Sequence, residues 1–149
     1  MKYTTQISDD IKKAMLAREK DKLEALRSVK TAFTLARTSK SADAELSDED
    51  EIKIMQKLVK QRKESAVIYN EQNRPELAEK EELEAKFLEV YLPAQLSEDE
   101  IKAAITEIVS ETGASTMADM GKVMGIASKK LAGKADGKFI SQIVRGLLS

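Results

Sequence analysis

Cysteine and histidine are both absent from the 149 residues of this sequence. Without cysteine there can be no disulfide and no thiolate nucleophile, and without either residue the usual sulfur and imidazole metal ligands are missing. The commonest general base near neutral pH is missing as well. We therefore predict no catalytic residue, no metal site and no cofactor, in a protein suited to a reducing compartment.

Aromatic residues make up only 4% of the chain and tryptophan is absent, which argues against stacking platforms for single-stranded nucleic acid. No hydrophobic run reaches the length of a membrane span. The first residues, MKYTTQISDD, lack the apolar core of a signal peptide. We expect a cytoplasmic location and no membrane partner.

Strong helix formers dominate the residues that are present, and their proportion predicts an all-α fold. One helical pattern ends in YLPAQLS, because Pro93 cannot continue the backbone hydrogen-bond ladder. We place a domain boundary there. The prediction is an N-terminal helical unit with a long helix hairpin at 1–94 and a C-terminal three-helix bundle at 95–149.

The N-terminal domain is predicted to begin with a short helix that Ser8 caps and that buries Ile11 and Met15. After a break at 18–21, a second helix should run to about residue 39. Its expected buried side consists of Leu23, Leu26, Val29, Phe33 and Ala36.

A long helical hairpin should follow, with Ser47 capping its first helix and Pro75 opening its second. Three charged residues, Arg62, Glu81 and Glu84, fall within the apolar seams of these helices. Paired carboxylates can do acid–base chemistry. However, an inward arginine needs carboxylate partners, so we favour a structural ion pair that fixes the register of the hairpin.

Three helices are predicted in the C-terminal domain, capped by Ser97, by Ser115 or Thr116, and by Asp136. Helical spacing gives each an apolar stripe. The stripes consist of Ile101, Ile105 and Ile108; of Met117, Met120, Met124, Ala127 and Leu131; and of Phe139, Ile140, Ile143, Val144, Leu147 and Leu148.

The segment DMGKVMGIASKKLAGKADGK holds four glycines and five lysines, but its spacing does not match a Walker A loop and no strand precedes it. Gly121 and Gly125 lie four apart within a helical pattern, which predicts close approach of another backbone. The alternative is that this bare helix surface meets an RNA backbone.

The same region is locally basic. Lys122 and Lys129 should share a helix face, and the start of the last helix should offer unpaired amides to an anion. A purely solvated charged face is the alternative. The predicted set for contacting a phosphate backbone is Lys122, Lys129, Lys130, Lys134, Lys138 and Arg145.

The stretch DMGKVMGIASKKLAGKADGKFISQIVRGLL resembles the C-terminal tail of the GatB/YqeY family. The stretch KQRKESAVIYNEQNRPELAEKEELEAKFLEVYLPAQLSEDEI is similar to the stand-alone YqeY-like proteins, and LEALRSVKTAF extends the resemblance over nearly the whole chain. The resemblance implies two small helical domains. It also implies kinship with the tail of the B subunit of the tRNA-dependent amidotransferase, where the tail helps to engage tRNA.

We therefore predict a non-catalytic adaptor that contacts tRNA backbone through its C-terminal domain. Its N-terminal domain would brace that contact or bind a protein of the aminoacyl-tRNA or translation machinery. The resemblance implies an alternative role in glutamine-dependent tRNA amidation, as an accessory to a carbon–nitrogen ligase. A third hypothesis is a protein-binding module that uses the Arg62 hairpin or the stripe of Met117, Met120 and Met124.

Overall fold

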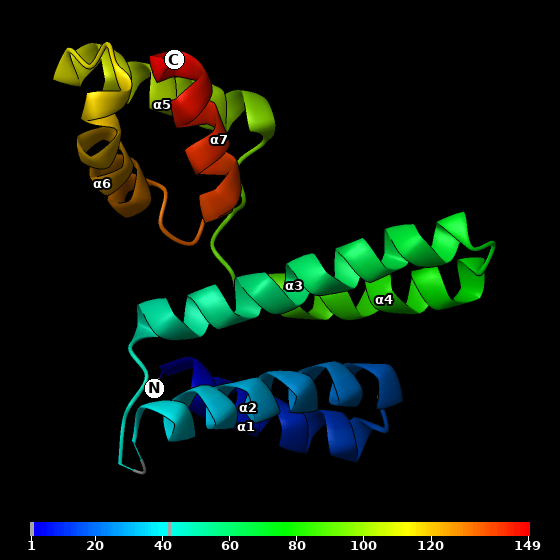
Figure 1. Cartoon of the computed structure of the whole chain (residues 1–149). Coiled ribbons are helices and arrows are strands. Elements are labelled where there is room, and N and C mark those ends of the chain that lie inside the picture. Colours follow the sequence, from blue (N-terminus) through cyan, green and yellow to red (C-terminus); the bar gives the residue numbers. More distant parts are fainter. Residues whose placement is uncertain (1, 42) are drawn as a thin grey trace. The chain divides into compact units, whose positions relative to one another are not determined.

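The computed structural model describes residues 2–41 and 43–149. These residues form seven α-helices and one short 3₁₀ turn, with no strand among them, so the predicted all-α class is confirmed (Figure 1). The chain divides into two compact units, Met1–Leu92 and Pro93–Ser149. The boundary predicted from the sequence, after residue 94, lies two residues further along the chain.

The N-terminal unit consists of two helical hairpins, one formed by α1 and α2 and the other by α3 and α4 (Figure 1). Both hairpins turn through a residue with left-handed backbone, Arg18 with φ 58° and Asn73 with φ 57°. Helix α2 packs against both helices of the second hairpin. The helices are α1 (Lys2–Ala17), α2 (Lys20–Lys40), α3 (Asp48–Glu71) and α4 (Pro75–Glu89).

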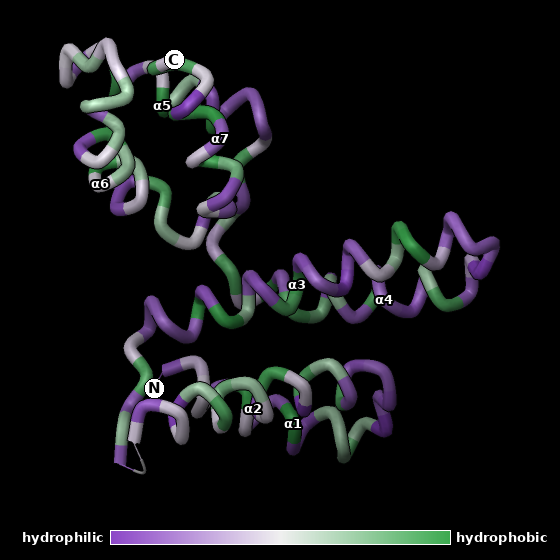
Figure 2. Tube along the Cα trace, in the orientation of Figure 1, coloured by the Kyte–Doolittle hydropathy of each residue, from purple (hydrophilic) through white to green (hydrophobic). Residues whose placement is uncertain are grey.

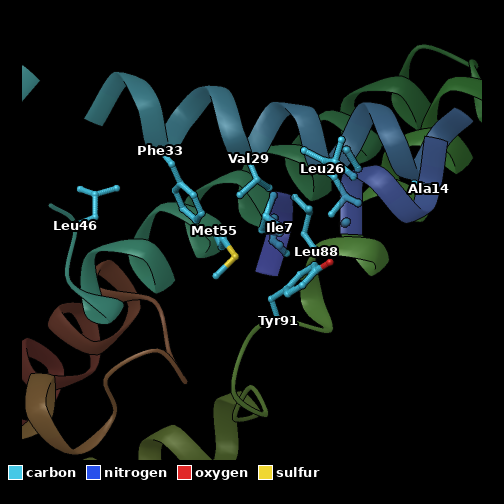
Figure 3. Packing of buried hydrophobic residues seen from close by; sticks show 13 residues of the cluster. Ile7, Ala14, Leu26, Val29, Phe33, Leu46, Met55, Leu88 and Tyr91 are labelled. Atoms are coloured by element: carbon cyan, nitrogen blue, oxygen red, sulfur yellow. The ribbon is translucent and has the colours of Figure 1, made fainter. Parts of the chain in front are cut away.

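One hydrophobic cluster joins these two hairpins (Figure 3). It contains the predicted inner side of α2, with Leu23 and Ala36 partly buried at its margins. Each large aliphatic side chain that is fully buried stabilises the fold by about 1.5–3 kcal/mol. The residues labelled in the figure are Ile7, Ala14, Leu26, Val29, Phe33, Leu46, Met55, Leu88 and Tyr91.

The first helix starts earlier than the sequence predicts, because its N-terminus is capped from a distant part of the chain. Ser8 lies inside α1 rather than at its start. The backbone N–H and the hydroxyl of Thr4 both donate to Oε2 of Glu51 on α3, at 2.6 and 2.7 Å. The buried side of α1 also differs from the prediction, because Ala14 is buried in place of Met15, which is 53% exposed.

The starts of α3 and α4 are confirmed. The Ser47 hydroxyl accepts a hydrogen bond from the N–H of Asp50 at 3.1 Å, and the Asp50 carboxylate accepts one from the N–H of Ser47 at 3.4 Å. Pro75 is the first residue of α4. The predicted seam of α4 is wrong at its beginning, where Leu77 is exposed and Ala78 is buried.

The C-terminal unit is built from three helices and a 3₁₀ turn around its own core. Ser97 and Asp136 cap α5 and α7 as predicted, each accepting a backbone hydrogen bond from the first turn. The elements are α5 (Glu98–Thr112), the 3₁₀ turn (Met117–Asp119), α6 (Met120–Lys130) and α7 (Gly137–Leu148). The buried residues are Ile101, Ile105, Ile108, Val123, Ala127, Leu131, Ile140, Val144 and Leu148.

The methionines of the second predicted stripe lie beside this core rather than at its centre. Met120 and Met124 are only partly buried, and Met117 is 45% exposed. The inner side of α6 is formed instead by Val123 and Ala127, which are fully buried. Met117 lies in the 3₁₀ turn, which is wound more tightly than the α-helix that follows it. The α-helical spacing that predicts the stripe therefore does not apply to Met117.

Hydrophobic and hydrophilic residues are interspersed along the helices of both units (Figure 2). This is the pattern of helices that turn one side to a core and the other to solvent. Among the described helices, none combines the length and the apolar character that a membrane span requires.

Gly121 and Gly125 face open space, which corrects the expectation that another backbone packs against them. Beyond the nearby backbone of its own helix and its two chain neighbours, a Cβ atom built at either position would meet no atom within 4 Å. Gly113 has a different role, because it ends α5 with a left-handed φ of 67°. The bare surface of α6 is therefore accessible, as the alternative of contact with an RNA backbone requires.

These placements predict opposite effects for two glycine-to-alanine changes. Gly125→Ala should stabilise the C-terminal unit by up to about 1 kcal/mol, because alanine is the better former of an exposed helix. Gly113→Ala should destabilise it by about 1–2 kcal/mol, because the left-handed backbone crowds a Cβ. Thermal unfolding of the two variants measures both effects, and a loss of stability in Gly125→Ala would contradict its open environment.

Candidate nucleic-acid interface

Three of the predicted phosphate-contacting residues lie on α6, and all three are exposed. Lys122 and Lys129 are seven residues apart and so share one side of the helix, with Gly125 between them. Lys129 and Lys130 occupy the last turn, where positive charge also interacts favourably with the helix dipole. The outer side of α6 thus presents lysines around a strip of backbone without side chains.

Lys134 lies in the turn between α6 and α7, which hydrogen bonds hold in place. The carbonyl oxygen of Lys134 accepts the N–H of Leu96 at 3.0 Å. The side-chain amide of Gln95 donates to the carbonyl oxygen of Gly133 at 2.7 Å. These bonds attach the turn to the segment before α5, so the exposed Lys134 side chain starts from a fixed backbone.

The last two predicted residues, Lys138 and Arg145, are exposed on the same side of α7. The expected anion site at the start of this helix is weaker than the sequence suggests. The Asp136 carboxylate accepts the N–H of Lys138 at 3.4 Å, so a negative charge already lies at the positive end of the helix dipole.

Charge is segregated among the three helices of this unit. Within the described part of the chain, no acidic side chain forms an ion pair with any of the six predicted cations. The exposed side of α5, by contrast, carries one base, Lys102, and five acids, Glu98, Asp99, Glu100, Glu107 and Glu111. The positive potential of the unit is therefore concentrated on α6, α7 and the turn that joins them.

Besides Asp136, a second acid lies near the basic residues. The Asp119 carboxylate accepts the backbone N–H groups of Ser115 and Thr116 at 3.1 and 3.3 Å. These bonds hold the pKa of Asp119 below its usual value, with a smaller contribution from the charge of Lys122. Asp119 therefore stays ionised and offsets part of the positive potential at the start of α6.

The second predicted set lies inside the N-terminal unit, where three helices meet. The guanidinium Nη1 of Arg62 on α3 contacts the Glu84 carboxylate on α4 directly and lies 3.5 Å from Oε2 of Glu81. Its Nη2 donates to the Ser28 hydroxyl on α2 at 2.8 Å. We call Arg62, Ser28, Glu81 and Glu84 the Arg62 cluster.

The Arg62 cluster has the features of a structural ion pair. Glu84 is only 5% exposed. Burial raises the pKa of Glu84, and the positive charge of Arg62 acts in the opposite direction. Both carboxylates are directed at one guanidinium, so neither is arranged as the free acid or base that a catalytic pair needs.

Sequence reasoning missed two polar residues that bond within the N-terminal unit, the buried Glu51 and the partly buried Ser28. Glu51 is fully buried, and its position four residues before Met55 on the seam of α3 was a usable signal. Ser28 gave none, because a serine between Arg27 and Val29 on a helix is ordinarily a surface residue.

Known proteins resemble this chain over both units. A family model described as Yqey-like protein matches residues 4–148. Altered inheritance of mitochondria protein 41 from Kluyveromyces lactis is 31% identical over 137 residues, which make up 89% of this chain and 68% of that protein.

A shorter stretch resembles proteins of tRNA-dependent amidation. A glutamyl-tRNA(Gln) amidotransferase subunit from Thermococcus sibiricus is 48% identical over 54 residues, and its counterpart from Thermococcus gammatolerans is 44% identical over 54 residues. Each match takes in 34% of this chain but only 9% of the length of the amidotransferase protein.

Proposed function

The chain belongs to the YqeY-like protein family, and from that premise we propose that it is a non-catalytic adaptor that contacts the tRNA backbone through its C-terminal unit. The observation that carries the proposal is the exposed set of six cations on α6, α7 and their joining turn, free of ion pairs among the described residues. The likeness to amidotransferase proteins named for Glu-tRNA(Gln) makes tRNA the nucleic acid to test first.

Such a surface binds phosphates without reading bases. Lysine is a flexible point charge, so it neutralises phosphate without imposing a fixed geometry. Binding through about six phosphates releases counterions and weakens steeply as salt rises. The open backbone at Gly121 and Gly125 would let a phosphate chain approach α6 closely.

The N-terminal unit would have a supporting role, as a brace or as a binder of a protein of the aminoacyl-tRNA or translation machinery. We also propose a cytoplasmic location, where reducing conditions suit a chain without disulfides. The Arg62 cluster would keep the two hairpins in one arrangement while the C-terminal unit engages RNA.

A gel-shift assay with the full chain and purified tRNA at about 50 mM salt tests the proposal. We expect a retarded complex that weakens progressively as salt is raised. Folded protein that leaves tRNA unshifted at this salt would contradict the proposal. Pull-down from cells with and without ribonuclease separates it from a protein-binding module, because ribonuclease would leave protein partners of such a module in place.

The partial match to amidotransferase proteins supports a second candidate, an accessory role in glutamine-dependent tRNA amidation. The two candidates differ in what the chain adds to a reaction. Amidation of misacylated tRNA by an amidotransferase, with glutamine and ATP, can be measured with and without the purified chain. More amidated product in the presence of the chain would favour the second candidate over the first.

A further inference from the structure

We propose that the N-terminal unit binds a small anion with an apolar group in a cavity at one end of its core. The cavity has a volume of about 150 Å³ and lies between α1, α2 and the segment before α3. All the residues that line the cavity belong to the N-terminal unit, so the proposal does not depend on the cations of the C-terminal unit. Its lining residues are Thr4, Lys30, Phe33, Thr34, Arg37 and Leu46.

Two cations at the cavity supply its charge. Lys30 and Arg37 are seven residues apart and share one side of α2. In the part of the chain that the structure describes, neither forms an ion pair with an acid. Asp50, an acid at the start of α3, is instead paired with Lys40 at 2.8 Å. Lys30 and Arg37 are therefore available to a ligand.

The hydroxyl groups in the lining already donate their protons within the protein. The Thr34 hydroxyl donates to the carbonyl oxygen of Lys30 at 3.0 Å. The Thr4 hydroxyl and N–H both donate to Glu51. The side-chain donors that remain at the cavity are the ammonium and the guanidinium, and both favour a carboxylate or phosphate.

The other wall of the cavity is apolar. Phe33 and Leu46 are each only 3% exposed and lie at the same end of the hydrophobic cluster (Figure 3). Only the edges of these side chains therefore reach the cavity. A ring or short aliphatic chain would cover this small apolar area, whereas an inorganic ion would leave it against water. The fitting ligand class is a small carboxylate or phosphate monoester with one apolar group.

Nuclear magnetic resonance titration of the full chain tests this site, with benzoate, phenyl phosphate and inorganic phosphate as probes at low salt. We expect saturable shifts of the Thr34, Arg37 and Leu46 amides with at least one aromatic anion. Tighter binding of benzoate would indicate that the ligand carries a carboxylate, and tighter binding of phenyl phosphate that it carries a phosphate monoester. Inorganic phosphate should bind about fivefold more weakly because it leaves the apolar wall uncovered.

Two variants and a matched control make the test specific. Lys30→Gln and Arg37→Gln should each weaken binding of the tighter probe about fivefold. Arg27→Gln removes one exposed cation from the same helix outside the cavity and should leave binding unchanged. Absence of saturable shifts with both aromatic anions, or an equal loss in Arg27→Gln, would overturn the proposal.

Discussion

Replacing Arg62 with methionine is expected to lower the free energy of unfolding of the N-terminal unit by about 3–5 kcal/mol, because it leaves a buried carboxylate without its partner. Glu84 would keep its place at 5% exposure, with Glu81 beside it and no guanidinium between them. The three tyrosines, Tyr3, Tyr69 and Tyr91, all belong to this unit, so tyrosine fluorescence during urea unfolding follows it selectively.

The neighbouring residue provides a matched control for this change. Lys63 pairs with Glu89 at 2.6 Å across the same two helices, but its side chain is 60% exposed. Exposed pairs contribute about 0–1 kcal/mol, so Lys63→Met should have a small effect. An equal loss of unfolding free energy in Arg62→Met and Lys63→Met would contradict the view that burial makes the Arg62 pair the more important one.

The loss caused by Arg62→Met should shrink as the pH falls. Burial already raises the pKa of Glu84, and removing Arg62 removes an influence that lowers it. A carboxyl with a raised pKa in the folded chain binds its proton more tightly there than in the unfolded chain, so protonation favours folding. Urea unfolding at neutral pH and at about pH 4 measures the change. A difference between wild type and variant that is unaltered by pH would contradict this reasoning.

Reversing the charge of Lys129, Lys130 and Lys134 together is expected to weaken tRNA binding at least about a hundredfold at 0.1 M salt. The change removes half of the proposed phosphate contacts and puts carboxylates in their place. All three residues are exposed at the end of α6 or in the turn after it, so the core of the C-terminal unit is untouched. Fluorescence anisotropy with labelled tRNA measures the affinity.

A control with the same change in net charge separates a local surface from a general attraction. Lys12, Lys53 and Lys57 are exposed lysines of the N-terminal unit on α1 and α3. Their joint reversal to glutamate should cost far less affinity than reversal in the C-terminal unit. Similar losses from the two triple variants would mean that the proposed residues do not form the binding surface.

The helices could largely be predicted because their signals are local. Ser47, Ser97 and Asp136 cap the helices that follow them, and Pro75 opens α4, as the sequence indicates. The start of α1 could not be predicted in this way. The acceptor for the hydrogen bonds of Thr4 at its N-terminus is Glu51, which lies 47 residues further along the chain. No sequence pattern near α1 indicates such a distant partner.

Candidate sites were predictable where helical spacing alone decides them. The pairing of Arg62 with Glu84 follows from the register of one hairpin, and the structure brings the two together. The open environment of Gly121 and Gly125 does not follow from spacing, because two glycines four apart suit a packed helix equally well. The cavity at Lys30 and Arg37 was also beyond prediction, since its lining comes from three separate segments.

The salt dependence of tRNA binding tests the central claim most directly. Anisotropy titrations of the full chain over a range of salt concentrations give the slope of log affinity against log salt. Six phosphate contacts predict a slope of about −4 to −5, and the Lys129, Lys130 and Lys134 reversal should reduce its magnitude to about 2 to 3. The same slope and affinity in the wild type and the reversal variant would contradict a tRNA-binding surface on α6 and α7.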